Sequence, residues 1–258
     1  MEDKEEIILS RLEDLAAKSD KAGIYTFSDF LAPEQVQAAL NIQAIRRAPH
    51  MLWGGAHCCE RKLFCFGSVE DMGYEPEFPI AVVRLRPAQE KFAQQLGHRD
   101  FMGAVMNLGV KRQVVGDIFI KDNTAYMFLK EQIAPFVMDN LNKVKNTQIR
   151  CELLDKNAAE LEELRPRTER IVCTVPSERL DAVIAAVYKL SRGNSAELIR
   201  SGLVQVNHRL SGDAAALLST GALVSVRGKG RFLYSGSLGQ SKKGRLRIAA
   251  EILSLIHI

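Results

Sequence analysis

The sequence lacks the compositional features that are typical of several classes of protein. It has 258 residues, of which only five are cysteine, eight are proline and 18 are glycine, and it contains no biased tract. This composition excludes a collagen-like, low-complexity or disordered chain. The cysteines are odd in number and no pair has CxxC spacing, which speaks against a disulfide framework. They are Cys58, Cys59, Cys65, Cys151 and Cys173.

Membrane and export signals are also missing from the sequence. No apolar run approaches the roughly 18 residues that a membrane-spanning helix needs. The chain begins Met-Glu-Asp-Lys-Glu-Glu, without the basic and then apolar stretch of a secretory signal. With 47% hydrophobic and 26% charged residues, the chain can form one large domain or two to three small ones. We expect a cytoplasmic monomer that has no membrane partner.

The positive charge is concentrated in the last third of the chain. The net charge is +4, but residues 172–247 carry twelve Lys and Arg against four Asp and Glu, a net charge of +8. The remainder carries 23 basic and 27 acidic residues, a net charge of −4. This asymmetry predicts that the C-terminal third binds a polyanion, although a solvated basic face would give the same pattern.

Hydrophobic periodicity predicts an α+β protein. Residues 1–75 are expected to form an N-terminal helical and hairpin subdomain, with a second helix beginning near Pro33 and short strands on either side of Gly54-Gly55. Residues 76–154 alternate in the order β-α-β-β-α-β, the split arrangement of ferredoxin-like and RRM-type domains. Phe119, Tyr126 and Phe128 lie on the central hairpin of this domain, where an RRM places the aromatic residues that stack on RNA bases. We expect most of the three to pack in the core instead.

The last third predicts a small domain of mixed elements. The charged segment 155–170 is interpreted as a linker, and residues 171–250 as two short helices packed on a short-stranded sheet. The first helix starts at Arg179, and Ser191 caps a second one that runs to Arg200. Arg227 to Arg231 form a basic, glycine-rich turn.

An ordered set of motifs in this region resembles the S-four RNA-binding domain, named after ribosomal protein four of the small subunit. The motifs are Arg179-Leu180-Asp181, Ser191-Arg192, Leu203 to Asn207, Thr220-Gly221 and Val224 to Arg227. Upstream motifs resemble the YlmH family. These are Phe27 to Leu31, Gly54-Gly55, Glu60-Arg61-Lys62, His98 to Gly103, Leu108 to Arg112 and Gly116-Asp117-Ile118. Members of that family pair an RRM-like N-terminal region with a C-terminal S-four domain.

The resemblance implies a non-enzymatic RNA-binding protein of the bacterial cytoplasm that acts at the ribosome. Its implied partners are rRNA and tRNA on the large ribosomal subunit, in quality control of stalled peptidyl-tRNA. The residues expected to contact RNA are basic or lie beside basic residues in the C-terminal domain. They are Arg179, Asp181, Lys189, Ser191, Arg192, Arg200, Arg209, Arg227, Lys229 and Arg231. Asp181 is expected to orient Arg179 or to meet an RNA hydroxyl.

Three catalytic or metal-binding interpretations are weaker. His98-Arg99-Asp100 occurs in protein kinases, but a kinase needs Asn where Val105 stands, so the triplet is expected to cap a helix. Arg179-Leu180-Asp181 occurs in pseudouridine synthases, but only about 75 residues follow it here. The spacing of Cys58, Cys59 and Cys65 does not match a zinc site. We therefore expect no catalytic residue, metal or cofactor.

Two further hypotheses remain open at this point. One is an RNA-modifying enzyme, and the other is a ribosome-assembly or interaction adaptor whose N-terminal region binds a protein. The last six residues, 253–258, match the translation of a common sequencing adapter, and we expect them to be a non-native tail that follows Ile252.

Overall fold

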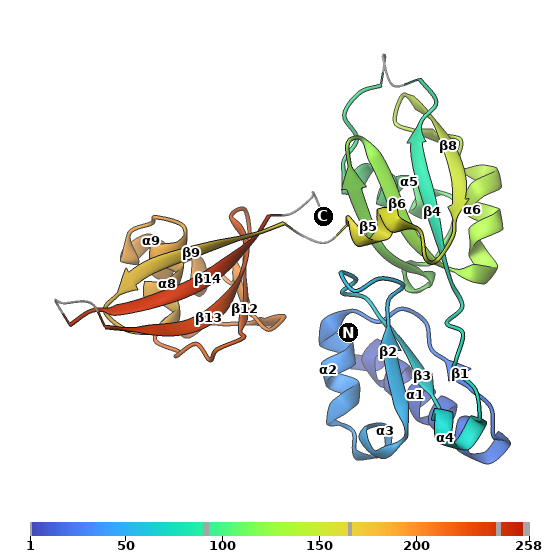
Figure 1. Ribbon diagram of the computed structural model, residues 1–258, viewed down its shortest axis with the longest axis horizontal. Coiled ribbons are helices and arrows are strands. Elements are labelled where there is room, and N and C mark those ends of the chain that lie inside the picture. Colours follow the sequence, from blue (N-terminus) through green and yellow to red (C-terminus); the bar gives the residue numbers. More distant parts are fainter. Residues whose placement is uncertain (1, 90–92, 165–166, 241–243, 255–258) are drawn as a thin grey trace. The chain divides into compact units, whose positions relative to one another are not determined.

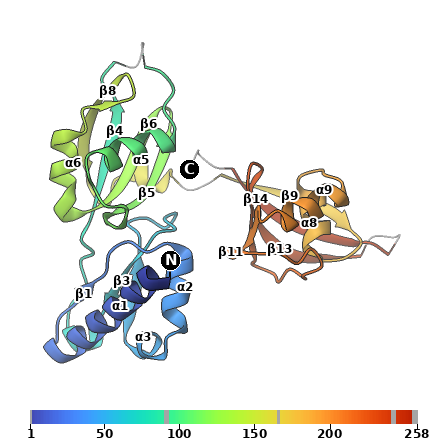
Figure 2. The ribbon, with the colours of Figure 1, turned by 180° about the vertical axis from the view of Figure 1, so that it is seen from behind.

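The computed structural model divides into two compact units, residues 1–165 and residues 166–255 (Figures 1 and 2). It describes residues 2–89, 93–164, 167–240 and 244–254. Helices and strands occur in both units, so the predicted α+β class is confirmed. None of the helices in these ranges combines the length and apolar character that a bilayer crossing demands.

The first part of the N-terminal unit is a three-stranded sheet with helices packed on it. Its elements are α1 (Glu2–Ala22), β1 (Thr26–Phe27), α2 (Pro33–Asn41), α3 (Gln43–Arg47), β2 (His50–Trp53), β3 (Leu63–Phe66) and α4 (Val69–Met72). The strands run in the order β1-β3-β2, and all pairs are antiparallel. Leu12, Val36 and Ile45 pack against Phe64 and Phe66, which fixes the helices on the sheet.

The central part has the predicted β-α-β-β-α-β order. Its main elements are β4 (Ile80–Pro87), α5 (His98–Asn107), β5 (Val115–Lys121), β6 (Thr124–Lys130), α6 (Ala134–Asn140) and β8 (Thr147–Leu154). The short β7 (Lys143–Val144) and the 3-10 turns Arg112–Val114 and Glu131–Ile133 complete it. The antiparallel sheet has the strand order β5-β6-β4-β8-β7.

Both faces of this central sheet contribute residues to buried cores. On one face Val83, Leu85 and Met127 pack against α5 and α6, which Figure 2 shows side by side on the sheet. On the opposite face Val82 and Phe128 join a core that also contains residues of the first part of the chain and of the segment after β8. Because strand side chains alternate between faces, the hydrophobic runs of β4 and β6 supply both cores.

The segment 155–170, predicted as a linker, contains the boundary between the two units, but part of it is packed structure. It contains α7 (Ala159–Glu162) and the first residues of a long strand. Leu161 and Leu164 are buried in the second core of the central sheet, at 6% and 1% exposure. The charged residues of the segment form ion pairs with the sheet, so charge here marks a docked helix and not a solvated connection.

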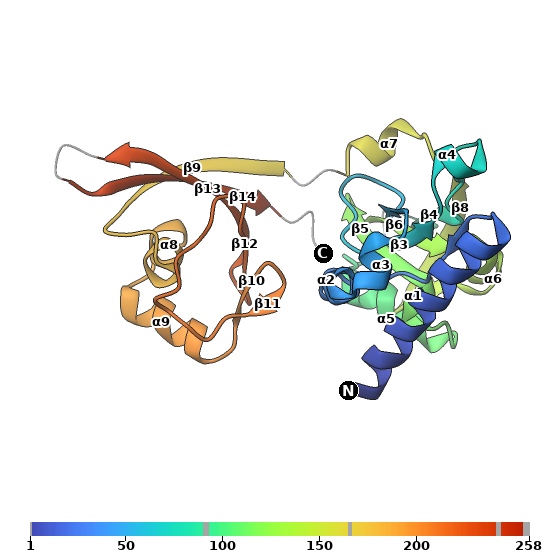
Figure 3. The ribbon, with the colours of Figure 1, turned by 90° about the horizontal axis from the view of Figure 1, so that it is seen from below.

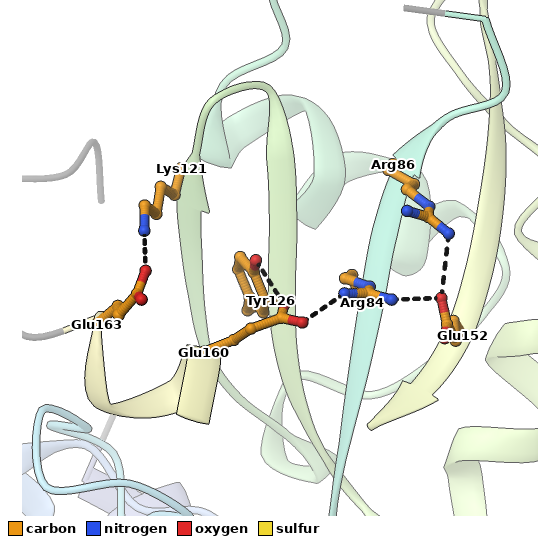
Figure 4. A network of polar contacts seen from close by, with 7 residues as sticks. All are labelled: Arg84, Arg86, Lys121, Tyr126, Glu152, Glu160 and Glu163. Carbon is orange, nitrogen blue, oxygen red and sulfur yellow. Dashed lines mark hydrogen bonds and ion pairs between the residues drawn. The ribbon is translucent and has the colours of Figure 1, made fainter. Parts of the chain in front are cut away.

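Figure 4 shows how α7 is held on the sheet. Glu160 accepts hydrogen bonds from Arg84 Nη1 (2.6 Å) and from the Tyr126 hydroxyl (2.9 Å), and Glu163 pairs with Lys121. Arg84 Nη2 also donates to Glu152 (2.6 Å). Arg84 and Lys121 on this side of the sheet are therefore matched by carboxylates of the protein itself.

The C-terminal unit is a six-stranded antiparallel sheet with two helices on one face (Figure 3). Its elements are β9 (Arg167–Val175), α8 (Leu180–Val187), α9 (Arg192–Arg200), β10 (Val204–Val206), β11 (Arg209–Leu210), β12 (Leu223–Val226), β13 (Gly230–Gln240) and β14 (Leu246–Ser254). The strands run in the order β11-β10-β12-β13-β14-β9. Val183, Ile184 and Ile199 of the helices pack on Val224 and Phe232.

Two strands of this sheet, β9 and β14, lie outside the sequence-based assignment of helices and strands. They pair with each other over their whole length, from Leu246 opposite Val175 to Ser254 opposite Arg167. The segment expected to be a non-native tail begins inside β14, with Leu253 opposite Thr168, and its residues 255–258 lie outside the described ranges.

Candidate nucleic-acid interface

The predicted binding region centres on the first turns of α8 and α9. Arg179 is the N-cap residue of α8, so the helix begins one residue later than predicted. Ser191 is the N-cap residue of α9, and its Oγ accepts a hydrogen bond from the Asn194 amide (3.1 Å). This bond satisfies one of the unpaired amides at the start of a helix, which is why Ser is favoured there.

One carboxylate joins the two helix starts. Arg179 Nε donates to Asp181 Oδ1 (3.1 Å), and Arg179 Nη2 donates to Oδ2 (3.1 Å). Arg192 Nη2 donates to the same Oδ2 (3.0 Å). A bidentate bond from one arginine and a single bond from another therefore fix two guanidinium groups beside each other.

The environment of Asp181 differs from that of its partners. Asp181 is 5% exposed, whereas the side chains of Arg179 and Arg192 are 38% and 52% exposed. Burial of Asp181 favours its neutral form, but hydrogen bonds from the two arginines outweigh this, so the pKa of the carboxyl is lowered from its ordinary value. Of the two roles predicted for Asp181, the structure shows the first: it is a buried carboxylate that orients Arg179, and it orients Arg192 as well.

Ser195 is a member of this site that sequence reasoning missed. Its side chain is fully buried, and its Oγ donates to the Asp181 carbonyl (2.8 Å) or to the Arg192 carbonyl (3.0 Å). It thereby fixes α9 against the first turn of α8, next to the ion pairs. A serine one turn after a helix cap gives no signal of this role in the sequence alone.

The other predicted residues lie outside this network. Lys189 is exposed and occupies the left-handed region (φ 53°) between α8 and α9. Arg200 lies at the C-terminal end of α9, and Arg209 lies on β11. Arg227 and Lys229 occupy the turn between β12 and β13, where Gly228 has a φ of 80° that only glycine adopts readily. Arg231 begins the next strand.

Several motif residues of the N-terminal unit serve packing. Asp117 Oδ2 accepts hydrogen bonds from the amides of Glu60 (2.6 Å) and Arg61 (2.9 Å), and burial raises the pKa of this carboxyl. Burial and the neighbouring Arg112 lower the pKa of Arg61 to about 10. A Cβ atom on Gly116 would lie 2.8 Å from the Phe30 ring, so glycine is required for this close contact. These residues join the first part of the unit to the central sheet.

The aromatic residues of the central hairpin are buried as predicted. Phe119, Tyr126 and Phe128 are 4%, 7% and 0% exposed. Cys58, Cys59, Cys65, Cys151 and Cys173 are all free thiols. In the described part of the chain, no three His, Cys, Asp or Glu side chains are grouped as metal ligands.

Comparisons with known proteins point to one family. Residues 74–158 match the protein family described as "Putative RNA-binding domain in YlmH". The "Ribosome-associated protein quality control protein P2" of Bacillus subtilis (strain 168) is 28% identical over 226 residues, which cover 87% of this chain and 86% of that protein. The resemblance to the YlmH family of RNA-binding proteins is confirmed.

A solved structure with a YlmH name was also found. The "Cell division protein ylmH from Streptococcus pneumoniae" has 18% sequence identity and a TM-score of 0.47, over 59% of this chain and 92% of that one. The YlmH family match covers the central domain, whereas every residue predicted to contact RNA lies in the C-terminal unit.

Proposed function

We propose that this protein is a non-enzymatic, ribosome-associated RNA-binding protein whose C-terminal unit is an S-four domain. In this proposal the domain binds rRNA and tRNA on the large ribosomal subunit and acts on stalled peptidyl-tRNA in the cytoplasm. The relative from Bacillus subtilis is named for ribosome-associated quality control, which supports the cellular setting. The observation that carries the molecular part is the pair of arginines held by Asp181.

The arginine pair has the properties that a phosphate site needs. Arg179 and Arg192 are both partly exposed, and their shared carboxylate is buried beneath them. A guanidinium group presents several donors in a fixed plane that matches phosphate oxygens. Holding both groups in place before RNA arrives reduces the entropy lost on binding. The basic balance of residues 172–247 adds attraction for a polyanion at longer range.

The geometry favours binding over catalysis at this site. In a pseudouridine synthase the aspartate must reach a flipped uridine, but both oxygens of Asp181 accept hydrogen bonds from arginines and the residue is buried. The same bonds make the carboxylate a structural partner of Arg179 and Arg192. We therefore retain RNA binding and not RNA modification as the proposed function.

Co-sedimentation with purified large subunits, with and without peptidyl-tRNA and across a salt series, tests the proposal. Arg192→Glu should reduce binding at least about tenfold, because it places a negative charge where a phosphate is expected. Arg247→Glu, an exposed residue of the same unit outside the arginine pair, is the charge-matched control. Unchanged binding by a folded Arg192→Glu protein would remove the assignment of this site.

Binding that strengthens with peptidyl-tRNA would support the role in quality control. If the wild-type protein binds neither form of the subunit, the proposed function is wrong. In that case the adaptor hypothesis, in which the N-terminal unit binds a protein, becomes the better alternative.

A further inference from the structure

In the central domain, the aromatic residues on the sheet face where RRM-type domains stack RNA bases are covered. Helices α5 and α6 pack on one face, and α7 with the first part of the chain covers the other face around β5 and β6, whereas Arg86 and Arg150 toward β8 are exposed. Phe119, Tyr126 and Phe128 lie in that second buried core. Stacking on them would require the core to open. RNA bound by residues 74–158 therefore does not stack on these three rings in this structure.

Several cations around the covered part of this face are also engaged. Arg84 pairs with Glu152 and Glu160, and Lys121 pairs with Glu163. At the edge of the same region, Lys156 pairs with Glu77 (2.8 Å). A cation that already pairs with a carboxylate must lose that partner before it binds a phosphate, so these residues are poor candidates.

A polar cleft on the helical side of the domain has a different character. It has a volume of about 560 Å³ and lies between the exposed side of α5, the end of α6 and β7. Its polar lining consists of one carboxylate, Asp100, together with Arg99, Asn107, Asn140, Asn142, Lys143 and Lys145. We name it the Arg99 cleft.

The cations of the Arg99 cleft are not all neutralised by the protein. Within the described ranges, Arg99 and Lys143 are exposed and form no ion pair, while Lys145 pairs with Asp100 (2.8 Å). Asn107 is exposed at the last position of α5. Cations that can hold phosphates thus lie beside amides that can bond to bases or ribose hydroxyls.

The structure also separates the roles within His98-Arg99-Asp100. Asp100 accepts a hydrogen bond from the Gly97 amide (2.9 Å), which caps α5 as predicted. Burial lowers the pKa of His98, and the charges of Arg112 and Arg99 lower it further. Of the three residues, Arg99 is the exposed one, and it lines the cleft.

We infer that the Arg99 cleft is a second RNA site, which binds single-stranded RNA through phosphate contacts from Arg99 and Lys143 and amide contacts from Asn107 and Asn142. This inference rests on the proposed RNA-binding function and places part of it in the domain that matches the YlmH family. The C-terminal arginine pair and the Arg99 cleft then contact RNA as separate sites on one chain. The volume of the cleft is within the range of small-ligand sites, which suits a single nucleotide.

Charge reversal in the full chain tests the inference against a matched control. The cleft variant carries Arg99→Glu and Lys143→Glu, and the control carries Lys111→Glu and Arg46→Glu. The two control cations are also exposed and form no ion pair within the described ranges, and they lie outside the cleft. Both variants change the net charge equally, so long-range electrostatics affects them alike.

Fluorescence anisotropy with a short unstructured RNA is the first measurement. The cleft variant should bind about tenfold more weakly than the control. Its slope of log affinity against log salt should fall by about 1.4, because about 0.7 is lost for each single-strand phosphate contact. Equal affinity and slope for the two variants would overturn the inference. A second variant, Asn107→Ala, tests the inference if the double variant does not fold. It keeps the net charge, so it should weaken RNA binding without changing the slope of log affinity against log salt.

Photo-crosslinking of wild-type protein to a thiouridine-labelled RNA locates the site directly. Crosslinked peptides should include residues 98–107 or 140–145. Crosslinks confined to residues 167–254 would overturn the second site and leave the proposed function standing. A different result is that crosslinks to the cleft persist in Arg192→Glu while that variant binds the large subunit as the wild type does. That result would leave the second site standing and overturn the proposed function. A ribosomal protein captured at the cleft with no RNA crosslink would overturn the inference in favour of a protein interface.

Discussion

At the scale of single residues, the main feature is a buried carboxylate that positions two exposed cations. Arg179 is two residues from Asp181 in the sequence, and Arg192 is eleven residues away. The long side chains would lose considerable rotamer entropy on binding a phosphate if they were free. The carboxylate already holds the two arginines in the unbound protein, so part of that entropy is lost before RNA binds. It therefore contributes to RNA binding through the geometry of the arginines more than through its charge.

Asp181→Asn separates these two effects because it keeps the volume of the side chain and removes its charge. If charge dominated, loss of a negative group beside the arginines would strengthen RNA binding. We expect binding to weaken by about tenfold, because an amide has one acceptor oxygen and cannot keep all three of these hydrogen bonds, and its NH2 group would face a guanidinium donor. Anisotropy with the RNA used above measures the effect.

Asp213→Asn provides the control, since it removes an exposed carboxylate of the same unit. It should leave affinity unchanged or raise it slightly. The stability cost of Asp181→Asn should be about 1 kcal/mol, because the half-exposed arginines can bond to water instead. Tighter RNA binding by Asp181→Asn would show that the carboxylate has no positioning role.

At the scale of elements, periodicity and capping predicted the helices well. Residue Pro33 begins α2, and Ser191 caps α9, because both positions follow from local backbone chemistry. The strands β4 to β6 were predicted because each is rich in β-branched, aromatic and other apolar residues. Local patterns of this kind need no knowledge of the distant chain.

The elements that were missed depend on distant partners. Strand β9 begins Arg-Thr-Glu-Arg, which gives no hydrophobic signal, and it is held by the neighbouring β14. The four residues of α7 are too few for a helical period, and the helix is placed by burial of Leu161 and Leu164. The contact of Arg192 with Asp181 likewise depends on how α9 packs against α8. Sequence patterns identified the right residues for this site but not their mutual arrangement.

The docking of α7 gives a stability prediction that a linker would not. Leu164→Ala should lower the free energy of unfolding of the N-terminal unit by about 2 to 3 kcal/mol, because it leaves a cavity in a buried core. Glu163→Ala, which removes only the exposed pair with Lys121, should cost less than about 1 kcal/mol. Urea unfolding followed by circular dichroism measures both. Equal and negligible effects would mean that α7 does not contribute to the core.

At the scale of the whole molecule, the chain carries separate cores. Three clusters of buried residues lie within residues 1–165, and the fourth lies within residues 166–255. No residue belongs to more than one cluster in the described ranges. Stability in such a chain is expected to divide between units, since each buries its own apolar surface.

Hydrogen exchange tests this division with one substitution in each unit. Val224→Asp places a charge at a fully buried position of the C-terminal core, and Val83→Asp does the same in the central sheet. A buried unpaired charge is costly enough to unfold a marginal domain, so each variant should lose amide protection in its own unit only. Loss of protection throughout the chain from either variant would mean that the units fold as one. Retention of protection in residues 80–87 and 124–130 of Val224→Asp would show that the N-terminal unit folds without the C-terminal one, and the Arg99 cleft can then be studied apart from the arginine pair.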